Sequence, residues 1–206
     1  MAIDWQFISD REGGRALKGY VPASETSKSG VTIGIGYDLG YCSAAQLRRD
    51  WRGRIADADI ETLEKLCRLK SEKARAKVGL ASVKRITVPL DAAREVFYAV
   101  SLPAYAAKCM KAYPGVERLP ADAQSAMLSL VFNRGTARSG SRRREMKALT
   151  TLIPKADLDG IAGQLISMKR LWAGKGLDGL LARRDRESAL VRGAQRTYRE
   201  DELVRI

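Results

Sequence analysis

The stretch SDREGGRALKGYVPASETSKSGVTIGIGYDLG, residues 9–40, combines carboxylates and a threonine with many glycines. Near its end, apolar residues alternate with Thr32, Gly34 and Gly36, which predicts a β-strand. At about 3.3 Å per residue, a straight strand would separate Thr32 from Asp38 by about 20 Å. Glycine permits a turn between them. We therefore predict a hairpin, in which Asp38 is either a working carboxylate or an ordinary turn residue.

Glu12 precedes this hairpin on a predicted helix over residues 4–12. Trp5 and Ile8 lie on the same helical face as Glu12, and two glycines after it end the helix. A carboxyl group drawn toward the core in this way is partly desolvated and keeps its proton near neutrality, as a general acid for glycoside cleavage requires. The alternative is an exposed glutamate near a helix end.

The composition describes a globular chain of 206 residues, with 45% hydrophobic and 30% charged residues. The chain has no histidine, which excludes Ser–His and Cys–His nucleophiles and His-ligated metal sites. The net charge of +13 favours a polyanionic partner. The basic run RSGSRRREMK, residues 138–147, binds such a polymer or forms a solvated loop.

The three cysteines, Cys42, Cys67 and Cys109, form no close pair in the sequence and are odd in number. This favours free thiols in a reducing compartment, although one bridge between two of them is left open. We see neither a secretory signal nor an apolar run long enough to cross a membrane. Synthesis in the cytoplasm of a bacterial host is therefore expected.

The rest of the chain is predicted to be mainly helical, which gives an α+β protein. Ser43 is a candidate N-cap. In one long region, Ile60, Leu63, Leu66 and Cys67 form a single apolar stripe. The regions with helical patterns are 43–51, 57–80, 90–113 (interrupted by Pro103), 119–137, 157–172 and 179–198.

The segments REGGRALKGYVP and GVTIGIGYDLG together resemble the lysozyme-like muramidases of the pesticin type, which are relatives of phage lysozymes. In that family a helix-borne Glu-Gly lies across a groove from a hairpin with the motif Thr-x-Gly-x-Gly-Tyr-Asp. The matching hairpin residues here are Thr32, Gly34, Gly36, Tyr37 and Asp38. The resemblance implies that Glu12 protonates the glycosidic oxygen, and that Asp38 and Thr32 orient the attacking water.

Two later segments extend the resemblance. DAQSAMLSLVFNRG, residues 122–135, looks like the central core helix of the family, and GLLARRDRESALVRG, residues 179–193, looks like the arginine-rich segment near the end of phage-type lysozymes. Asn133 either contacts substrate or bridges the helix end. Tyr37 and Trp172 either flank the sugar groove or belong to the core. The candidate substrate-binding residues are Gly34, Gly36, Tyr37 and Asn133.

One feature departs from the T-even phage lysozymes, which carry the catalytic Asp before the Thr. Here Thr26 occupies the position six residues before Thr32, and the nearest carboxylate is Glu25. The chain thus follows the pesticin arrangement. We predict Asp38 as the second carboxylate and keep Glu25 as the alternative.

The resemblance implies one two-lobed, lysozyme-like domain over 1–206, with a catalytic helix and β-hairpin over about 1–42 and a helical body over about 43–206. It implies a groove between the lobes and a monomer that cleaves the β-1,4 bond between N-acetylmuramic acid and N-acetylglucosamine, without metal or organic cofactor. The expected partners are peptidoglycan in the periplasm and an anionic outer-membrane surface. A phage endolysin is favoured over an injected antibacterial effector, which would also have an immunity protein.

Three rival functions remain. One is a wall-binding module without activity, which the presence of Glu12, Thr32 and Asp38 disfavours. A lytic transglycosylase cleaves the same bond without water and needs one acidic residue, whereas Asp38 and Thr32 favour hydrolysis. A basic nucleic-acid-binding protein would explain the charge but not the motif, and no zinc finger, phosphate loop or RNA motif is found. Nucleic acid is therefore not expected as a partner.

Overall fold

The computed structural model describes residues 1–4, 18–22, 29–194, 197, 198, 200 and 203–206. Helices dominate this part of the chain, and two small antiparallel sheets provide its β-structure. The predicted α+β class is confirmed. The chain divides into two compact units, which we call the hairpin unit (the described residues of 12–102) and the helical unit (the described residues of 1–11 and 103–206).

The hairpin unit begins with the β-hairpin and continues as short helices around a core that includes Trp51, Ile60 and Phe97. Its elements are β2 (Thr32–Ile33), β3 (Tyr37–Asp38), the 3-10 turn η1 (Leu39–Tyr41), α2 (Ala44–Trp51), α3 (Asp57–Glu64), α4 (Ser71–Val78), α5 (Ala81–Lys84), α6 (Leu90–Val96) and the π-helical η2 (Phe97–Ser101).

The start of α2 agrees with the prediction. The Ser43 hydroxyl accepts a hydrogen bond from the Gln46 amide at 3.2 Å, which satisfies one of the unpaired donors of the first helical turn. Leu47 and Trp51 from this helix are fully buried. The local cap and the apolar face therefore both determine α2.

The region 57–80 is helical, as predicted, but in two short helices, α3 and α4, so the apolar stripe from Ile60 to Cys67 extends past the end of α3 at Glu64. Arg68 and Ser71 both have left-handed backbone, with φ of 65° and 50°, and this interrupts a helix. The Arg68 amide donates to the Leu39 carbonyl at 3.0 Å. A tertiary hydrogen bond thus replaces the helical bond that the periodicity alone would predict.

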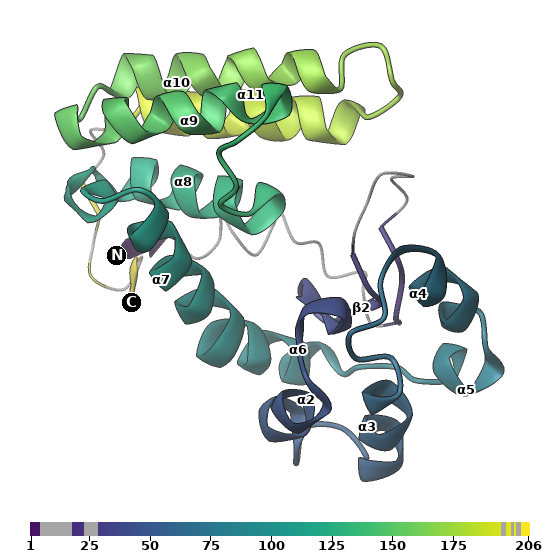
Figure 1. The fold of residues 1–206 in the computed structure, drawn as a ribbon. Coiled ribbons are helices and arrows are strands. Elements are labelled where there is room, and N and C mark those ends of the chain that lie inside the picture. The colour runs from purple at the N-terminus through teal and green to yellow at the C-terminus, as the bar shows by residue number, and fades with distance from the viewer. Residues whose placement is uncertain (5–17, 23–28, 195–196, 199, 201–202) are drawn as a thin grey trace. The chain divides into compact units, whose positions relative to one another are not determined.

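The helical unit is built around α8, most of whose residues are buried. Its elements are β1 (Ala2–Asp4), α7 (Leu102–Ala112), η3 (Val116–Arg118), α8 (Ala121–Arg134), η4 (Ser141–Arg143), α9 (Arg144–Leu152), η5 (Ile153–Lys155), α10 (Leu158–Ser167), η6 (Met168–Leu171), α11 (Asp178–Arg192) and β4 (Leu203–Arg205). Figure 1 shows α9, α10 and α11 together on one side of α8, and α11 packs directly on α8.

The prediction of a buried helix over 119–137 is confirmed by α8. Ala123, Met127 and Leu130 are fully buried, and Gly135 follows the helix end with a φ of 67°. Helix α9 is not among the predicted elements, because the run of arginines before it is also typical of a solvated loop.

The region 90–113 is helical, as predicted, but its interruption lies before Pro103. The π-helical segment η2 precedes α7, and Pro103 is the second residue of α7. Helices α6, η2 and α7 follow one another without a break, so Pro103 lies inside a continuous helix, where it lacks the N–H of a helical hydrogen bond. The π-helical turn directly before it is one of the local adjustments found where a helix is disturbed.

The two ends of the chain meet in a sheet that the sequence did not predict. β1 pairs antiparallel with β4, with Ala2 opposite Arg205. The Ala2 amide also donates to Oε1 of Gln124 on α8 at 2.9 Å, and Ile3 is fully buried. Across the described ranges, the model contains no helix that is long and apolar enough to span a membrane.

Candidate active site

The hairpin places Thr32 and Asp38 directly opposite each other in the register of β2 and β3. The connecting turn has left-handed backbone at Gly34 (φ 53°) and Gly36 (φ 69°), a conformation that glycine adopts at least cost. Opposed residues of an antiparallel pair have side chains on the same face, with Cβ atoms about 4.5–5.5 Å apart. The predicted turn is confirmed, and it brings the hydroxyl and the carboxylate together.

A third segment fixes the position of Thr32. The Thr32 amide donates to the Tyr20 carbonyl at 2.7 Å, and the Tyr20 amide donates to the Thr32 carbonyl at 3.1 Å. Both backbone groups of Thr32 are therefore used on the side away from Asp38. The Thr32–Asp38 pair is of the non-hydrogen-bonded kind, in which opposed side chains approach more closely.

The Asp38 carboxylate is held by two backbone amides. Its Oδ1 accepts hydrogen bonds from the Gly30 and Gly40 amides, each at 2.8 Å. The two glycines lie so close that a Cβ atom on Gly30 would be 2.4 Å from the Gly40 nitrogen. Gly30 and Gly40 are not among the predicted site residues, although Asp38-x-Gly40 is a typical Asx-turn pattern. The turn orients the carboxylate, whose Oδ2 has no hydrogen-bond donor among the described residues.

Tyr37 and Gly34 support the hairpin from the core side. The Tyr37 hydroxyl donates to Oδ2 of Asp50 at 2.8 Å, and its ring meets the Trp51 ring edge-on at 5.5 Å. Burial and this hydrogen bond raise the pKa of Tyr37, so the phenol stays neutral. A side chain at Gly34 would meet Trp51 at 3.0 Å. These positions favour the packing interpretation of Tyr37.

Residues 2–143 of the chain match the model of one protein family, which is described as "Pesticin", the C-terminal part of a bacterial toxin homologous to phage lysozyme. The matched region is more than half of the chain and contains the whole hairpin. The chain belongs to the pesticin family. A search of curated proteins found no match to it. Membership supports a lysozyme-like peptidoglycan hydrolase in general terms.

Two carboxylates assigned from the pesticin resemblance, Glu12 and Glu25, lie outside the described residues. Their roles remain predictions, and so does the distance between the Glu12 and Asp38 carboxyl groups. Gly36 is half-buried at the hairpin turn. Asn133 belongs to the helical unit, where its Oδ1 accepts a hydrogen bond from Arg184 Nη2 at 3.4 Å. This contact is the bridge at the end of α8 that was one of the two interpretations of Asn133.

The arginine-rich segment on α11 lies beyond the pesticin match and forms a buried ionic cluster with α8. Arg184 and Glu187 are both fully buried and paired at 2.8 Å. The Ser129 hydroxyl donates to the same Glu187 oxygen at 2.6 Å, and Arg183 donates to the Ser129 hydroxyl at 2.9 Å. Burial lowers the pKa of Arg184 to about 10, so it remains charged near neutrality. The cluster thus has a structural role, but its burial was not predicted.

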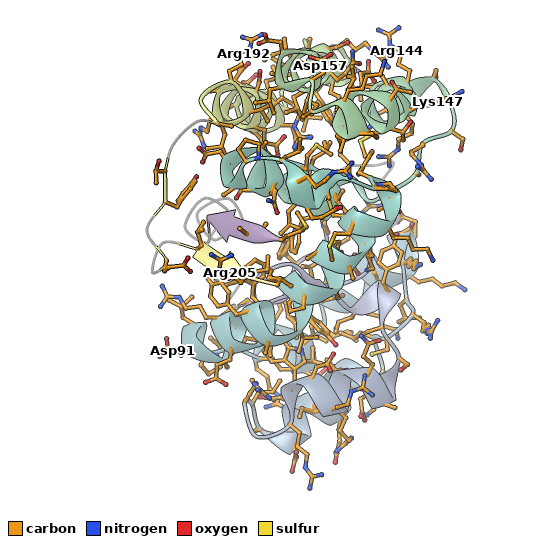
Figure 2. All side chains as sticks on the ribbon, turned by 90° about the vertical axis from the view of Figure 1, so that its left-hand side faces the viewer. Asp91, Arg144, Lys147, Asp157, Arg192 and Arg205 are labelled. Atoms are coloured by element: carbon orange, nitrogen blue, oxygen red, sulfur yellow. The ribbon has the colours of Figure 1, made fainter. Side chains whose placement is uncertain are left out.

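The basic segment 138–147 surrounds a surface hollow of about 640 Å³. The hollow is lined by Arg138, Ser139, Gly140, Arg144 and Lys147. Arg144 and Lys147 come from the first turn of α9 and are labelled in Figure 2. The buried Glu145 accepts two hydrogen bonds from Arg170 and one from Arg144 at 2.9 Å. Arg138 and Lys147 make no ion pair with another described residue, so their positive charge is available to an anionic partner.

Proposed function

We propose that this member of the pesticin family is a muramidase that hydrolyses the β-1,4 bond between N-acetylmuramic acid and N-acetylglucosamine in peptidoglycan. Glu12 is the general acid that protonates the glycosidic oxygen. Asp38 is the general base, and Thr32 helps it to hold the attacking water. The reaction then inverts the anomeric centre, which requires carboxyl groups about 6.5–9.5 Å apart.

The opposed pair of Thr32 and Asp38 is the observation that supports this proposal most strongly. A water molecule that attacks a sugar needs one acceptor for its proton and one further hydrogen-bond partner to direct its lone pair. The Asp38 carboxylate supplies the first group and the Thr32 hydroxyl the second, on one face of the hairpin. Because Gly30 and Gly40 hold Oδ1 in place, the carboxylate is oriented before substrate arrives.

The proposed biological role of this activity is the lysis of bacteria by hydrolysis of their peptidoglycan. Release by a phage, as an endolysin, requires the fewest additional partners. Injection as an antibacterial effector is the alternative, and a producing cell would then need an immunity protein. The cations around the 138–147 hollow would hold the enzyme at an anionic wall or outer-membrane surface in either case.

The test is the clearing of purified Gram-negative peptidoglycan, followed by mass analysis of the soluble fragments. The native protein should clear the suspension and produce reducing muramic-acid ends. Glu12→Gln should lower the rate at least about 100-fold, the contribution typical of a general acid. Anhydro-muramic ends would instead identify a lytic transglycosylase. Failure of the native protein to clear the suspension would refute the proposal.

Two further variants distinguish between the two candidates for the second carboxylate. A third variant serves as a matched control. Asp38→Asn should abolish most of the activity, whereas Glu25→Gln should retain it. The reverse result would assign the general base to Glu25. Glu72→Gln removes an exposed carboxylate from α4 and should change nothing.

A further inference from the structure

Two of the three cysteines lie together in the hairpin unit. The Sγ atoms of Cys42 and Cys67 are 3.7 Å apart and share a hydrogen bond. Cys42 is almost fully buried and Cys67 is half-buried. Cys109 is fully buried and belongs to the helical unit. The chain therefore contains one pair of neighbouring thiols and one isolated thiol.

The backbone around the pair is already held in place. Cys42 ends the η1 turn that follows Asp38, and its amide donates to the Leu39 carbonyl at 3.4 Å. The amide of Arg68, next to Cys67, donates to the same carbonyl at 3.0 Å. The segments that carry the two cysteines are thus joined at the Leu39 carbonyl, and neither segment has to refold for the sulfurs to meet.

The sulfurs need only a small movement to bond. A disulfide has an S–S distance of about 2.05 Å, so the two Sγ atoms must approach by roughly 1.7 Å. Rotation of the two side chains would break only weak thiol contacts to backbone carbonyls, at 3.6 Å from Cys42 and 3.8 Å from Cys67. No strong hydrogen bond opposes this change.

We propose that Cys42 and Cys67 are a disulfide-forming pair, which locks the turn after Asp38 to the turn after α3 when the protein meets a disulfide-bearing oxidant. The Cys67 thiolate attacks the disulfide of the oxidant, which releases one thiol and leaves a mixed disulfide on Cys67. The Cys42 thiolate then attacks Cys67 Sγ and expels the second thiol. The two cysteines lose two protons and two electrons in total, and the oxidant gains them as two thiols.

The environment of the pair suits these roles. Cys67 is the more exposed thiol, so an oxidant reaches it first. While both thiols are free, their shared hydrogen bond lowers the pKa of Cys42 and raises the pKa of Cys67. Once Cys67 carries the mixed disulfide, Cys42 is the second nucleophile because its sulfur lies 3.7 Å from Cys67 Sγ. Burial raises the pKa of Cys109 to about 12, so this isolated thiol stays inert. The disulfide forms in an oxidising compartment. The two thiols stay reduced where glutathione keeps cysteines free.

The experiment treats the full-length protein with oxidised glutathione or with dithiothreitol, and then counts free thiols after unfolding. The native protein and Cys109→Ser should each lose two thiols, and their mass should fall by about 2 Da. Peptide mapping should link Cys42 to Cys67. The melting temperature should rise by several degrees in the oxidised form, because the bridge restricts the unfolded chain. Dithiothreitol should reverse all of these changes.

The single variants Cys42→Ser and Cys67→Ser should show no intramolecular bridge and no redox-dependent change in melting temperature. Should a variant fail to fold, the thiol count of the native protein still decides the question. Retention of all three thiols in the oxidised native protein, or a bridge that includes Cys109, would overturn the proposal. None of these measurements uses peptidoglycan, so this result is independent of the muramidase assay.

Discussion

Thr32 and Asp38 are direct cross-strand partners, although six positions separate them in the sequence. Two left-handed glycines reverse the chain between them, and their side chains share one face of the hairpin. This relationship is the geometric basis for a water site between a hydroxyl and a carboxylate. It predicts that each residue contributes to the chemical step.

Asp38→Asn should lower kcat by about 10²–10⁴-fold, because an amide cannot accept the proton of the attacking water. The Asn oxygen can still accept the hydrogen bonds from the Gly30 and Gly40 amides. The turn should therefore persist, and the melting temperature and KM should change little. Steady-state kinetics on soluble wall fragments would measure this. An active Asp38→Asn enzyme would contradict the assignment.

Thr32→Val should lower kcat by a smaller factor, about 10-fold or more, because it removes one hydrogen-bond partner of the water but keeps the β-branched shape. Thr32→Ser retains the hydroxyl and should recover most of the activity. Loss of activity in Thr32→Ser but not in Thr32→Val would show that the packing of the Thr32 methyl group, and not its hydroxyl, is what matters.

Gly30→Ala should disrupt the Asp38 anchor. A Cβ atom there would lie 2.4 Å from the Gly40 nitrogen and 2.6 Å from the Leu69 carbonyl oxygen, so backbone would have to move. We expect a loss of about 2 kcal/mol or more in the free energy of unfolding, together with reduced activity. Gly79→Ala is the matched control in the same unit, because a Cβ atom at Gly79 meets nothing within 4 Å. Denaturant titration of both variants provides the comparison.

Glu145 should make stability depend on acid pH. Burial alone would raise the pKa of this carboxyl, but hydrogen bonds from Arg170 and Arg144 lower it from 4.5 to about 2. Because the folded-state pKa is the lower one, the ion pairs contribute stability above about pH 4.5 and lose it as the pH falls toward 2.

Glu145→Gln should therefore cost on the order of 3 kcal/mol at pH 7, and this difference from the native protein should shrink between pH 4.5 and pH 2. Denaturant titrations at several pH values would measure it. Glu72→Gln, at an exposed ion pair with Arg75, should show no such change. A difference that does not vary with pH would argue against an ionised Glu145.

Removing one partner of the buried pair Arg184 and Glu187 should lower the free energy of unfolding strongly. Replacing both partners with apolar residues should lower it much less. Arg184→Met leaves the Glu187 carboxylate without its closest cation and should cost about 3–5 kcal/mol. The double variant Arg184→Met with Glu187→Leu removes both buried charges and should recover most of that loss. Additive losses in a double-mutant cycle would show that the two charges do not interact.

The basic surface around the hollow should speed wall binding at low salt. The triple variant Arg138→Gln, Arg144→Gln and Lys147→Gln should clear walls several-fold more slowly in dilute buffer. The difference should disappear near roughly 1 M salt, where the screening length falls to about 3 Å. The control removes three exposed lysines of the hairpin unit, Lys73, Lys77 and Lys84, and so has the same net charge. Equal slowing in both triple variants would mean that total charge, and not this surface, controls binding.

Elements whose signals lie within a few neighbouring residues can be predicted without the fold. Alternation of apolar residues with glycines predicts the hairpin, because side chains alternate along a strand and glycine allows the turn. Ser43 before an apolar face predicts the start of α2, since the cap and the helix period are both local properties. The candidate residues Glu12, Thr32 and Asp38 also follow from one short motif.

Contacts between residues that are far apart in the sequence depend on the tertiary structure. The Arg68 amide bonds to the Leu39 carbonyl between the two short helices of the region 57–80. Glu187 reaches Ser129, and Cys42 reaches Cys67, across separations that no local pattern records. Spacing along a chain specifies the face of an element, but burial and pairing depend on which other element covers that face. The packing of the folded chain makes that choice.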